Sequence, residues 1–353
     1  MTTKHVAGYY ASWKVYSTCK IEEIDPTLCT ILYYAFAGLN EDGTIKVLDH
    51  WADIDKGGYK EFTGLKKKNS QLKTLLSVGG WNEGSEKYSN MVRSETNRQA
   101  FIKSAINYCQ TYGFDGIDFD WEYPCQRGGR PEDKENFSKF LQETYTEFNK
   151  HGYLLTVAVA AGESHIGESY DVPVISKNVH YINIMTYDMH SYLDGRTGEN
   201  SPLFSDDHLN VQYCTKAWIS NGANPQKILL GIGSYGKTYT LANSANHGIG
   251  APTSGPGLPG PNSRAAGTLA YDEILEDEKS GWTKQWSDKQ QVPYLYSGNQ
   301  WVGYDDEDSV RKKVEFAKQL NLGGLMMWSV DMDDPRGTCG PSYPLLKTIQ
   351  KNL

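Results

Sequence analysis

The sequence predicts an α/β protein folded as a (β/α)8 TIM barrel, with a small α+β insertion between its seventh and eighth strands. Eight apolar or β-branched runs recur along the 353 residues, segments with helical spacing separate them, and one connection is far longer than the rest. Near-continuous apolar strands are typical of parallel sheets whose two faces are covered. Closure of eight such units into a barrel is the simplest solution, and an open doubly wound sheet is the alternative.

Each strand is predicted from a run of Val, Ile, Leu or aromatic residues. In chain order the runs are "HVAGYYA" (5–11), "CTILYYAFAGL" (29–39), "KTLLSVGGW" (73–81), "FDGIDFDWEY" (114–123), "YLLTVAVAA" (153–161), "VHYINIMTYDMH" (179–190), "KILLGIGSYG" (227–236) and "GGLMMWSVDMDD" (323–334). Because helical segments lie between these runs, the order is that of a repeated βα unit.

Helices are predicted where apolar residues recur three or four positions apart, as in residues 137–148, 211–218 and 310–320. Glycines after such segments suit the left-handed conformation that ends many helices. We therefore expect helix stops at positions that include Gly152 and Gly323.

The connection between the seventh and eighth strands is too long for one helix and includes "GIGAPTSGPGLPGPNSRAAG" at 248–267. A structureless loop of that length is unusual in a compact domain, and "TLAYDEI" and "PYLYSGNQWVGY" have strand- or helix-forming patterns. The prediction is a catalytic barrel of residues 1–236 and 303–353. An α+β subdomain of residues 237–302 walls one side of its reactive face.

The composition of the chain limits the kinds of molecule that it is expected to bind. A net charge of −8 argues against nucleic-acid and anionic-membrane partners and favours a neutral substrate. Because no apolar run reaches the roughly 18 residues of a spanning helix, and the first residues lack the apolar core of a signal peptide, we expect a soluble chain. The six cysteines lack metal-ligand spacing, so disulfides and buried thiols are both open.

The fourth strand carries an unusual concentration of acids. In "DGIDFDWEYP", residues 115–124, Asp118, Asp120 and Glu122 alternate with apolar residues and so share one face of a strand. Their α-carbons are expected roughly 6.6 Å apart, near the C-terminal strand end where barrels place their reactive groups. Crowding of carboxylates raises the pKa of at least one of them. Asp115, at the start of the strand, is expected to support structure.

Such a cluster suits glycoside hydrolysis. A carboxylic acid that stays protonated near neutral pH can donate its proton to a departing oxygen, while an ionised neighbour stabilises positive charge. A divalent-metal site and an internal polar network are the alternatives. No phosphate-cradling loop accompanies the acids, so we predict neither metal nor cofactor.

Aromatic residues gather at or near the C-terminal ends of the predicted strands. Sugar rings present apolar C–H faces that stack on such side chains, although a single aromatic there is by default core. Together they predict a stacking groove made by Tyr9, Tyr10, Trp13, Trp81, Tyr187, Tyr235 and Trp328.

From about Lys4 to its C-terminus the chain resembles the family 18 glycoside hydrolases, the chitinases. The acidic strand has their Asp-x-x-Asp-x-Asp-x-Glu signature, and "YYASW", "LLSVGGWN", "MTYDMH", "YGKTYTL", "QWVGYDD" and "GGLMMWSVDMDD" are similar to further segments of animal-type catalytic domains. The resemblance implies endo-type hydrolysis of β-1,4-linked N-acetylglucosamine polymers. It also implies a retaining mechanism in which the acetamide of the substrate is the nucleophile and forms an oxazolinium ion.

The resemblance also implies catalytic roles. Glu122 is the general acid and later the base, Asp120 orients the acetamide, and Asp118 shares a proton with Asp120. Tyr187 hydrogen-bonds the acetamide carbonyl, and Asp188 contacts the distorted sugar.

Groove residues are implied in the same way. Trp328 forms the floor, Met185 belongs to the acetyl pocket, and the remaining substrate contacts are Tyr9, Trp13, Trp81, Asn82, Tyr235 and Lys237. His190 is either a partner that tunes Asp188 or a structurally hydrogen-bonded histidine.

Several positions depart from the family pattern. Lys237 replaces an arginine, a groove glutamate is absent from "SRAAG", and "HSYLD" lacks a groove tryptophan, for which Tyr192 is a partial substitute. The usual disulfide partner of Cys29 falls at Gly8, which leaves Cys19 as an alternative partner.

The resemblance further implies a secreted monomer that binds chitin and chitooligosaccharides. Two rival functions remain. A chitin-binding lectin of the same fold would lack the acid, so the presence of Glu122 favours an enzyme. A metal-dependent hydrolase would use the aspartates as ligands and lose activity on chelation.

Overall fold

The computed structural model describes residues 4–353 and contains a closed barrel of eight parallel strands. The strands are β1 (His5–Ala11), β2 (Ile31–Leu39), β4 (Lys73–Gly79), β5 (Gly116–Asp120), β6 (Leu154–Ala160), β7 (Tyr181–Met185), β8 (Ile228–Gly233) and β15 (Gly324–Trp328). Each pairs with its neighbours in chain order, and β1 closes the barrel by pairing with both β2 and β15. The predicted fold class is confirmed, and a short strand β3 (Ile45–Lys46) adds an antiparallel hairpin to β2.

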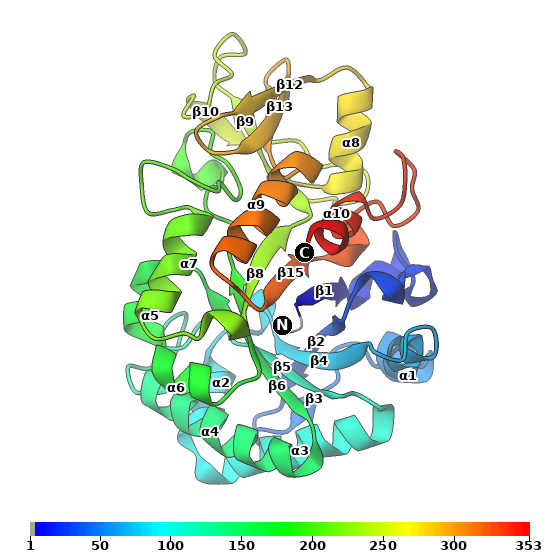
Figure 1. Ribbon diagram of the computed structural model, residues 1–353, viewed down its shortest axis with the longest axis vertical. Coiled ribbons are helices and arrows are strands. Elements are labelled where there is room, and N and C mark those ends of the chain that lie inside the picture. Colours follow the sequence, from blue (N-terminus) through cyan, green and yellow to red (C-terminus); the bar gives the residue numbers. More distant parts are fainter. Residues whose placement is uncertain (1–3) are drawn as a thin grey trace.

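Helices surround the barrel, and Figure 1 shows them on its outside. They are α1 (Gly58–Gly64), α2 (Glu86–Arg93), α3 (Glu95–Tyr112), α4 (Asp133–His151), α5 (Glu163–Ser169), α6 (Val172–Lys177), α7 (Val211–Ser220), α9 (Glu307–Gln319) and α10 (Pro344–Asn352). Gly152 ends α4 with a φ of 71°, as predicted. Gly323 is not a helix stop, because Asn321 takes the left-handed conformation after α9. A Cβ at Gly323 would lie 2.3 Å from the Gln226 carbonyl oxygen, so close packing explains that glycine.

The long connection between β8 and β15 forms a second, antiparallel sheet. Its elements are β9 (Tyr235–Leu241), β10 (Thr253–Pro256), β11 (Thr268–Ala270), helix α8 (Tyr271–Lys279), β12 (Thr283–Ser287), β13 (Val292–Ser297) and β14 (Gln300–Gly303). This insertion lies at one end of the long axis of the molecule (Figure 1). The sheet extends slightly beyond the predicted limits of residues 237–302, and the division into separate domains stays a prediction.

Alternation along the barrel strands decides which side chains face the site. On β5, Phe119 points outward and packs against Phe101 of α3 and Phe140 of α4, with ring centroids 5.5 and 4.8 Å away. Asp118 and Asp120 therefore point into the barrel. On β1, Tyr10 points outward onto Phe62 of α1 and donates to the backbone oxygen of Cys19, so its predicted place in the groove is wrong.

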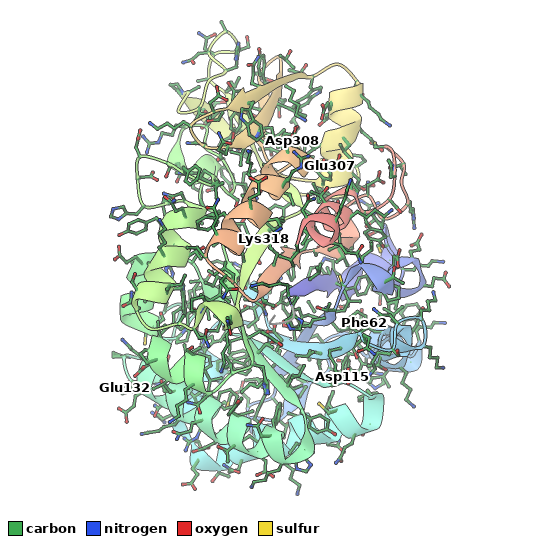
Figure 2. The ribbon with its side chains drawn as sticks, in the orientation of Figure 1. Phe62, Asp115, Glu132, Glu307, Asp308 and Lys318 are labelled. Carbon is green, nitrogen blue, oxygen red and sulfur yellow. The ribbon has the colours of Figure 1, made fainter. Side chains whose placement is uncertain are left out.

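The N-terminal end of β5 is held by an ion pair. Asp115, labelled in Figure 2, accepts hydrogen bonds from the backbone N–H of Thr74 and from Lys66 Nζ, at 2.8 and 3.0 Å. These contacts tie β5 to β4 and to the 3₁₀ turn Leu65–Lys67 that follows α1. These contacts agree with the prediction that Asp115 supports structure.

No disulfide joins the six cysteines, all of which lie in the described part of the chain. The alternative pairing of Cys19 with Cys29 is therefore absent. Cys29 instead faces Gly8, where a Cβ would lie 3.5 Å from its sulfur. Within residues 4–353 no helix is both long and apolar enough to cross a membrane.

Candidate active site

Three acids lie at the C-terminal end of β5, but only two of them are on the strand. Asp118 and Asp120 are 0% and 4% exposed inside the barrel. The strand ends at Asp120, so the predicted strand of residues 114–123 is too long. Glu122 lies in the following loop and is partly buried, which means that loop contacts rather than the strand pleat set its direction.

Asp118 is held by side chains from four other strands. Its Oδ2 accepts hydrogen bonds from the Tyr9 hydroxyl and from Ser77 Oγ, both at 2.7 Å. Its Oδ1 accepts from Thr156 Oγ1 at 2.6 Å and from Asn183 Nδ2 at 3.3 Å. Burial raises the pKa of Asp118, and the hydrogen bonds oppose that rise because they stabilise the carboxylate.

Asp120 has the opposite surroundings. Burial, followed by the nearby charges of Glu122 and Asp118, raises its pKa well above the ordinary value. Its Oδ1 is buried, and no donor within residues 4–353 reaches it. A buried acceptor without a partner is costly, so this oxygen is suited to receive a hydrogen bond from a ligand.

Glu122 is poised to hold a proton near neutral pH. Burial raises its pKa to about 7, and the charge of Asp188 adds to the rise. A hydrogen bond with Tyr123 and the positive charge of Arg127 act in the other direction. At neutral pH a group with this pKa is close to half protonated, which suits a residue that must first donate and then accept a proton.

Asp188 follows β7 and is fixed by two elements of the chain. Its backbone N–H donates to Asn200 Oδ1 at 2.9 Å, and its Oδ1 accepts from the Tyr235 hydroxyl at 2.7 Å. Lys237 Nζ also lies 2.7 Å from this Oδ1. Tyr235, Lys237 and Asp188 are therefore brought together, whereas His190 contacts Asp194 at 3.1 Å. Of the two interpretations of His190, the structure favours the structural one.

Tyr187 lies beside this group. Its ring is 6.1 Å from that of Tyr235, and its buried hydroxyl contacts the sulfur of Met326 at 3.9 Å. A thioether is a weak acceptor, so the hydroxyl keeps most of its hydrogen-bonding capacity for a ligand. Met185, at the end of β7, is partly buried and packs in the inner barrel cluster that includes Tyr187.

Trp328 ends β15 and forms an aromatic floor with residues from β1, β2 and the loop after β1. The ring centroids of Tyr9, Phe36 and Trp13 lie 5.4, 5.5 and 6.3 Å from that of Trp328. Phe36 is nearly parallel to Trp328, with an interplanar angle of 15°. Sequence patterns do not single out Phe36, because it lies within an apolar strand where an aromatic residue is by default core.

Trp81 and Asn82 follow β4 and are both exposed, Trp81 to 56%. The guanidinium carbon of Arg127 lies 3.4 Å from the centre of the Trp81 ring. Arg127 Nη1 also donates to the backbone oxygens of Trp81 and Glu122, each at 2.9 Å. Sequence reasoning misses Arg127 as well, since nothing in the pattern around it distinguishes it from a solvated surface arginine.

Tyr192 packs on the insertion. It lies against the cluster of Tyr239 and Trp301, and a Cβ at Gly267 would be 2.9 Å from its ring. Its position is that of a wall residue between the loop after β7 and the second sheet. No group of three or more His, Cys, Asp or Glu side chains within residues 4–353 is arranged to hold a metal ion.

Comparisons with known proteins match nearly the whole chain. The family model "Glycosyl hydrolases family 18" matches residues 5–333. Chitotriosidase-1 of Mus musculus is 39% identical over 98% of this chain and 77% of its own length. A crystal structure of an Ostrinia furnacalis Group IV chitinase in complex with allosamidin has a TM-score of 0.97 and 41% identity over 99% of this chain and 98% of that one. Human YKL-39, described as a pseudo-chitinase with retained chitooligosaccharide binding properties, has a TM-score of 0.92 and 37% identity over 99% of both chains.

Proposed function

The chain belongs to glycosyl hydrolase family 18, and we propose that it is a chitinase that cleaves β-1,4 linkages between N-acetylglucosamine units. One observation carries the proposal. Glu122, with a pKa of about 7, stands beside Asp120, whose buried Oδ1 has no donor among the described residues. The pair offers a proton and a hydrogen-bond acceptor to the same ligand, as cleavage assisted by an acetamide requires.

In the first step Glu122 gives its proton to the glycosidic oxygen while the C1–O bond breaks. Asp120 accepts a hydrogen bond from the acetamide N–H, which increases the negative charge on the acetamide oxygen. That oxygen bonds to C1, and an oxazolinium ion forms, so no enzyme nucleophile is needed. Asp118, held by four donors, shares a proton with Asp120 in this mechanism.

In the second step water attacks C1 from the face that the leaving group has vacated. Its proton passes to the Glu122 carboxylate, and the bond between C1 and the acetamide oxygen breaks. The configuration at C1 is therefore retained, and Glu122 regains its starting proton. The Tyr187 hydroxyl donates to the acetamide oxygen, and Met185 contacts the acetyl methyl group.

Substrate positioning falls to the remaining residues. Trp328 supports the sugar whose bond breaks, Trp13 extends this floor, and Tyr9, which is only 1% exposed, packs against Trp328. Asp188, in its contacts with Tyr235 and Lys237, binds the distorted ring. Trp81 and Asn82 contact the sugar that departs, so the barrel and the insertion together line the groove.

The partners are chitin and chitooligosaccharides, bound by a secreted monomer that cuts within the polymer. The ligands of the relatives support this substrate class, since allosamidin occupies one chitinase and chitooligosaccharides bind another relative. Release of fluorophore from chitobiose and chitotriose glycosides tests the activity. Analysis of the products from a hexasaccharide then distinguishes cleavage within the chain from cleavage at its end.

A lectin is the rival function, because a relative of similar structure is a pseudo-chitinase. A lectin would bind the same glycosides without releasing fluorophore. Glu122 and its raised pKa favour the enzyme, since a binding protein gains nothing from a proton donor at this position. Binding of a hexasaccharide without any turnover between pH 4 and 8 would establish the lectin.

A further inference from the structure

We propose that Lys313, a buried lysine of α9, is a positioning residue for Tyr187 and Asp188 of the candidate active site. It acts through Asn200 and Ser201, two consecutive residues that contact the loop after β7. The inference rests on the proposed function, in which Tyr187 and Asp188 contact the sugar whose bond breaks. It assigns a role at the site to a helix on the outside of the barrel (Figure 1).

The loop after β7 has a backbone conformation that needs support. Asp188 has a φ of 58°, in the left-handed region that residues other than glycine adopt rarely. Such a conformation persists only where the surrounding structure holds it, and such residues are concentrated at functional sites. The Asp188 side chain is 53% exposed, so much of the support has to reach its backbone.

Three hydrogen bonds from Asn200 and Ser201 supply this support. The backbone N–H groups of Asp188 and Met189 donate to Asn200 Oδ1 and to the Asn200 backbone oxygen, each at 2.9 Å. Ser201 Oγ donates to the backbone oxygen of Thr186 at 2.6 Å. The segment that carries both proposed substrate contacts is therefore held at each of its ends.

Lys313 holds Ser201 from the side of α9. Its Nζ donates to the backbone oxygen and to Oγ of Ser201, at 2.6 and 2.8 Å. The two carboxylate oxygens of Asp305 lie 2.6 and 2.7 Å from the same Nζ. An ammonium group has three N–H donors, so these contacts engage all of them. Because Asp305 lies between β14 and α9, the end of the insertion, an outer helix and the Ser201 segment meet at one cation.

Stability does not by itself account for this ion pair. The side chains of Lys313 and Asp305 are both 0% exposed. Taking two charges out of water is costly, and a well-packed apolar pair of similar volume is often equally stable or more stable. An apolar pair cannot donate to Ser201, however. The property that depends on Lys313 is therefore the position of the Ser201 segment and of the loop that this segment holds.

Replacing the ion pair by apolar residues tests the inference without leaving a buried charge. Lys313→Met/Asp305→Val should keep a thermal midpoint close to that of the wild type and lose the donors to Ser201. Amide hydrogen exchange at Asp188 and Met189 should become at least about 5-fold faster. Calorimetry in a Glu122→Gln background, where chitin hexasaccharide is not cleaved, should show a Kd raised by about 3- to 10-fold, the loss expected for one hydrogen bond.

Two comparisons distinguish positioning from a general loss of structure. Arg98→Met/Glu143→Leu removes a partly buried ion pair between α3 and α4, in which Arg98 also donates to a backbone oxygen at 2.9 Å. This control should change neither the exchange of the two amides nor the Kd. In an Asp188→Ala background, replacing the Lys313 ion pair should raise the Kd by a smaller factor than in the parent, because the two changes affect the same contact.

Ser201→Ala is a milder variant that keeps the ion pair and removes only the Ser201 hydroxyl. It should change exchange and Kd in the same direction by smaller factors, and it serves as the test if the double variant does not fold. Unchanged exchange or an unchanged Kd in the folded variants would overturn the inference, as would equal effects of the Arg98 control. If the Glu122→Gln parent does not bind the hexasaccharide, the proposed function fails instead, and the exchange rates still decide whether Lys313 holds Asp188.

Discussion

The guanidinium of Arg127 stacks on the indole of Trp81, with 3.4 Å between the guanidinium carbon and the ring centre. Its Nη1 also donates to the backbone oxygens of Trp81 and of Glu122. One side chain thus connects the exposed Trp81 ring with the loop that carries Glu122, the proposed proton donor. Movement of Arg127 would disturb both.

Replacing Arg127 should move the pH profile. The positive charge of Arg127 lowers the pKa of Glu122, so Arg127→Ala should raise that pKa and shift the alkaline limb of kcat/KM to higher pH. Arg127→Lys keeps the positive charge but loses the planar stack on Trp81. The alkaline limb should therefore stay at the wild-type pH, while kcat/KM falls. The measurement is kcat/KM for a chitobiose glycoside between pH 4 and 9. An alkaline limb that stays in place in Arg127→Ala would contradict this role.

The raised pKa of Glu122 also predicts how the free energy of unfolding depends on pH. Its pKa is about 7 in the folded protein and near 4.5 when unperturbed, so its contribution to folding is fully present below about pH 4.5 and is lost as pH rises through 7. Glu122→Gln cannot ionise. The variant should match the wild type at pH 4 and exceed it above pH 7, by on the order of 2–3 kcal/mol in free energy of unfolding. Urea titrations at pH 4 and pH 8 measure the difference, and equal stabilities at pH 8 would refute the prediction.

Removal of the Tyr9 hydroxyl should lower both kcat and the free energy of unfolding. Tyr9→Phe removes one of the two donors to Asp118 Oδ2 and leaves the ring stacked on Tyr33 and packed against Trp328. We expect about a tenfold loss of kcat and a fall of about 1.5–3 kcal/mol in free energy of unfolding, as for a buried hydrogen bond to a charged group. Tyr33→Phe is the control, since the Tyr33 hydroxyl contacts Asn183 at 3.4 Å instead of Asp118. Equal effects of both substitutions would remove the special role of Tyr9.

Lys237 offers a test of the proposed contact between Asp188 and the substrate. Lys237→Ala leaves Tyr235 as the remaining side-chain donor to the Asp188 carboxylate and should raise KM by about 3- to 10-fold with a smaller change in kcat. Lys237→Arg keeps the positive charge, in a forked geometry, and should have a KM close to that of the wild type. Initial rates over a range of chitotriose glycoside concentrations separate the two constants. A loss confined to kcat would place Lys237 in the chemical step instead.

Strand patterns suffice to predict the barrel because a parallel strand buried on both sides leaves a continuous apolar run, and all eight strands fall within the predicted runs. The same patterns predict which residues of β5 face inward, since alternation is a local property of the backbone. They fail at Glu122, which lies beyond the strand end, where the pleat of β5 no longer sets the direction of a side chain.

Other residues of the site depend on packing between distant segments. Phe36 and Trp328 are separated by most of the chain and meet only because β1, which pairs with both β2 and β15, closes the barrel. Tyr9 and Tyr10 look equivalent in the sequence, yet the pleat of β1 turns one toward Asp118 and the other toward Phe62. Predicting these contacts requires the register of the closed barrel, and the pattern of a single strand does not contain that information.

Glu122→Gln is the most direct test of the proposed chitinase. The substitution keeps the shape of the side chain and removes its proton donor, so turnover of a chitotriose glycoside should fall by at least about 10²-fold while calorimetric binding of the hexasaccharide persists. Near-normal turnover in this variant would contradict the assignment of Glu122 as the acid and the mechanism built on it.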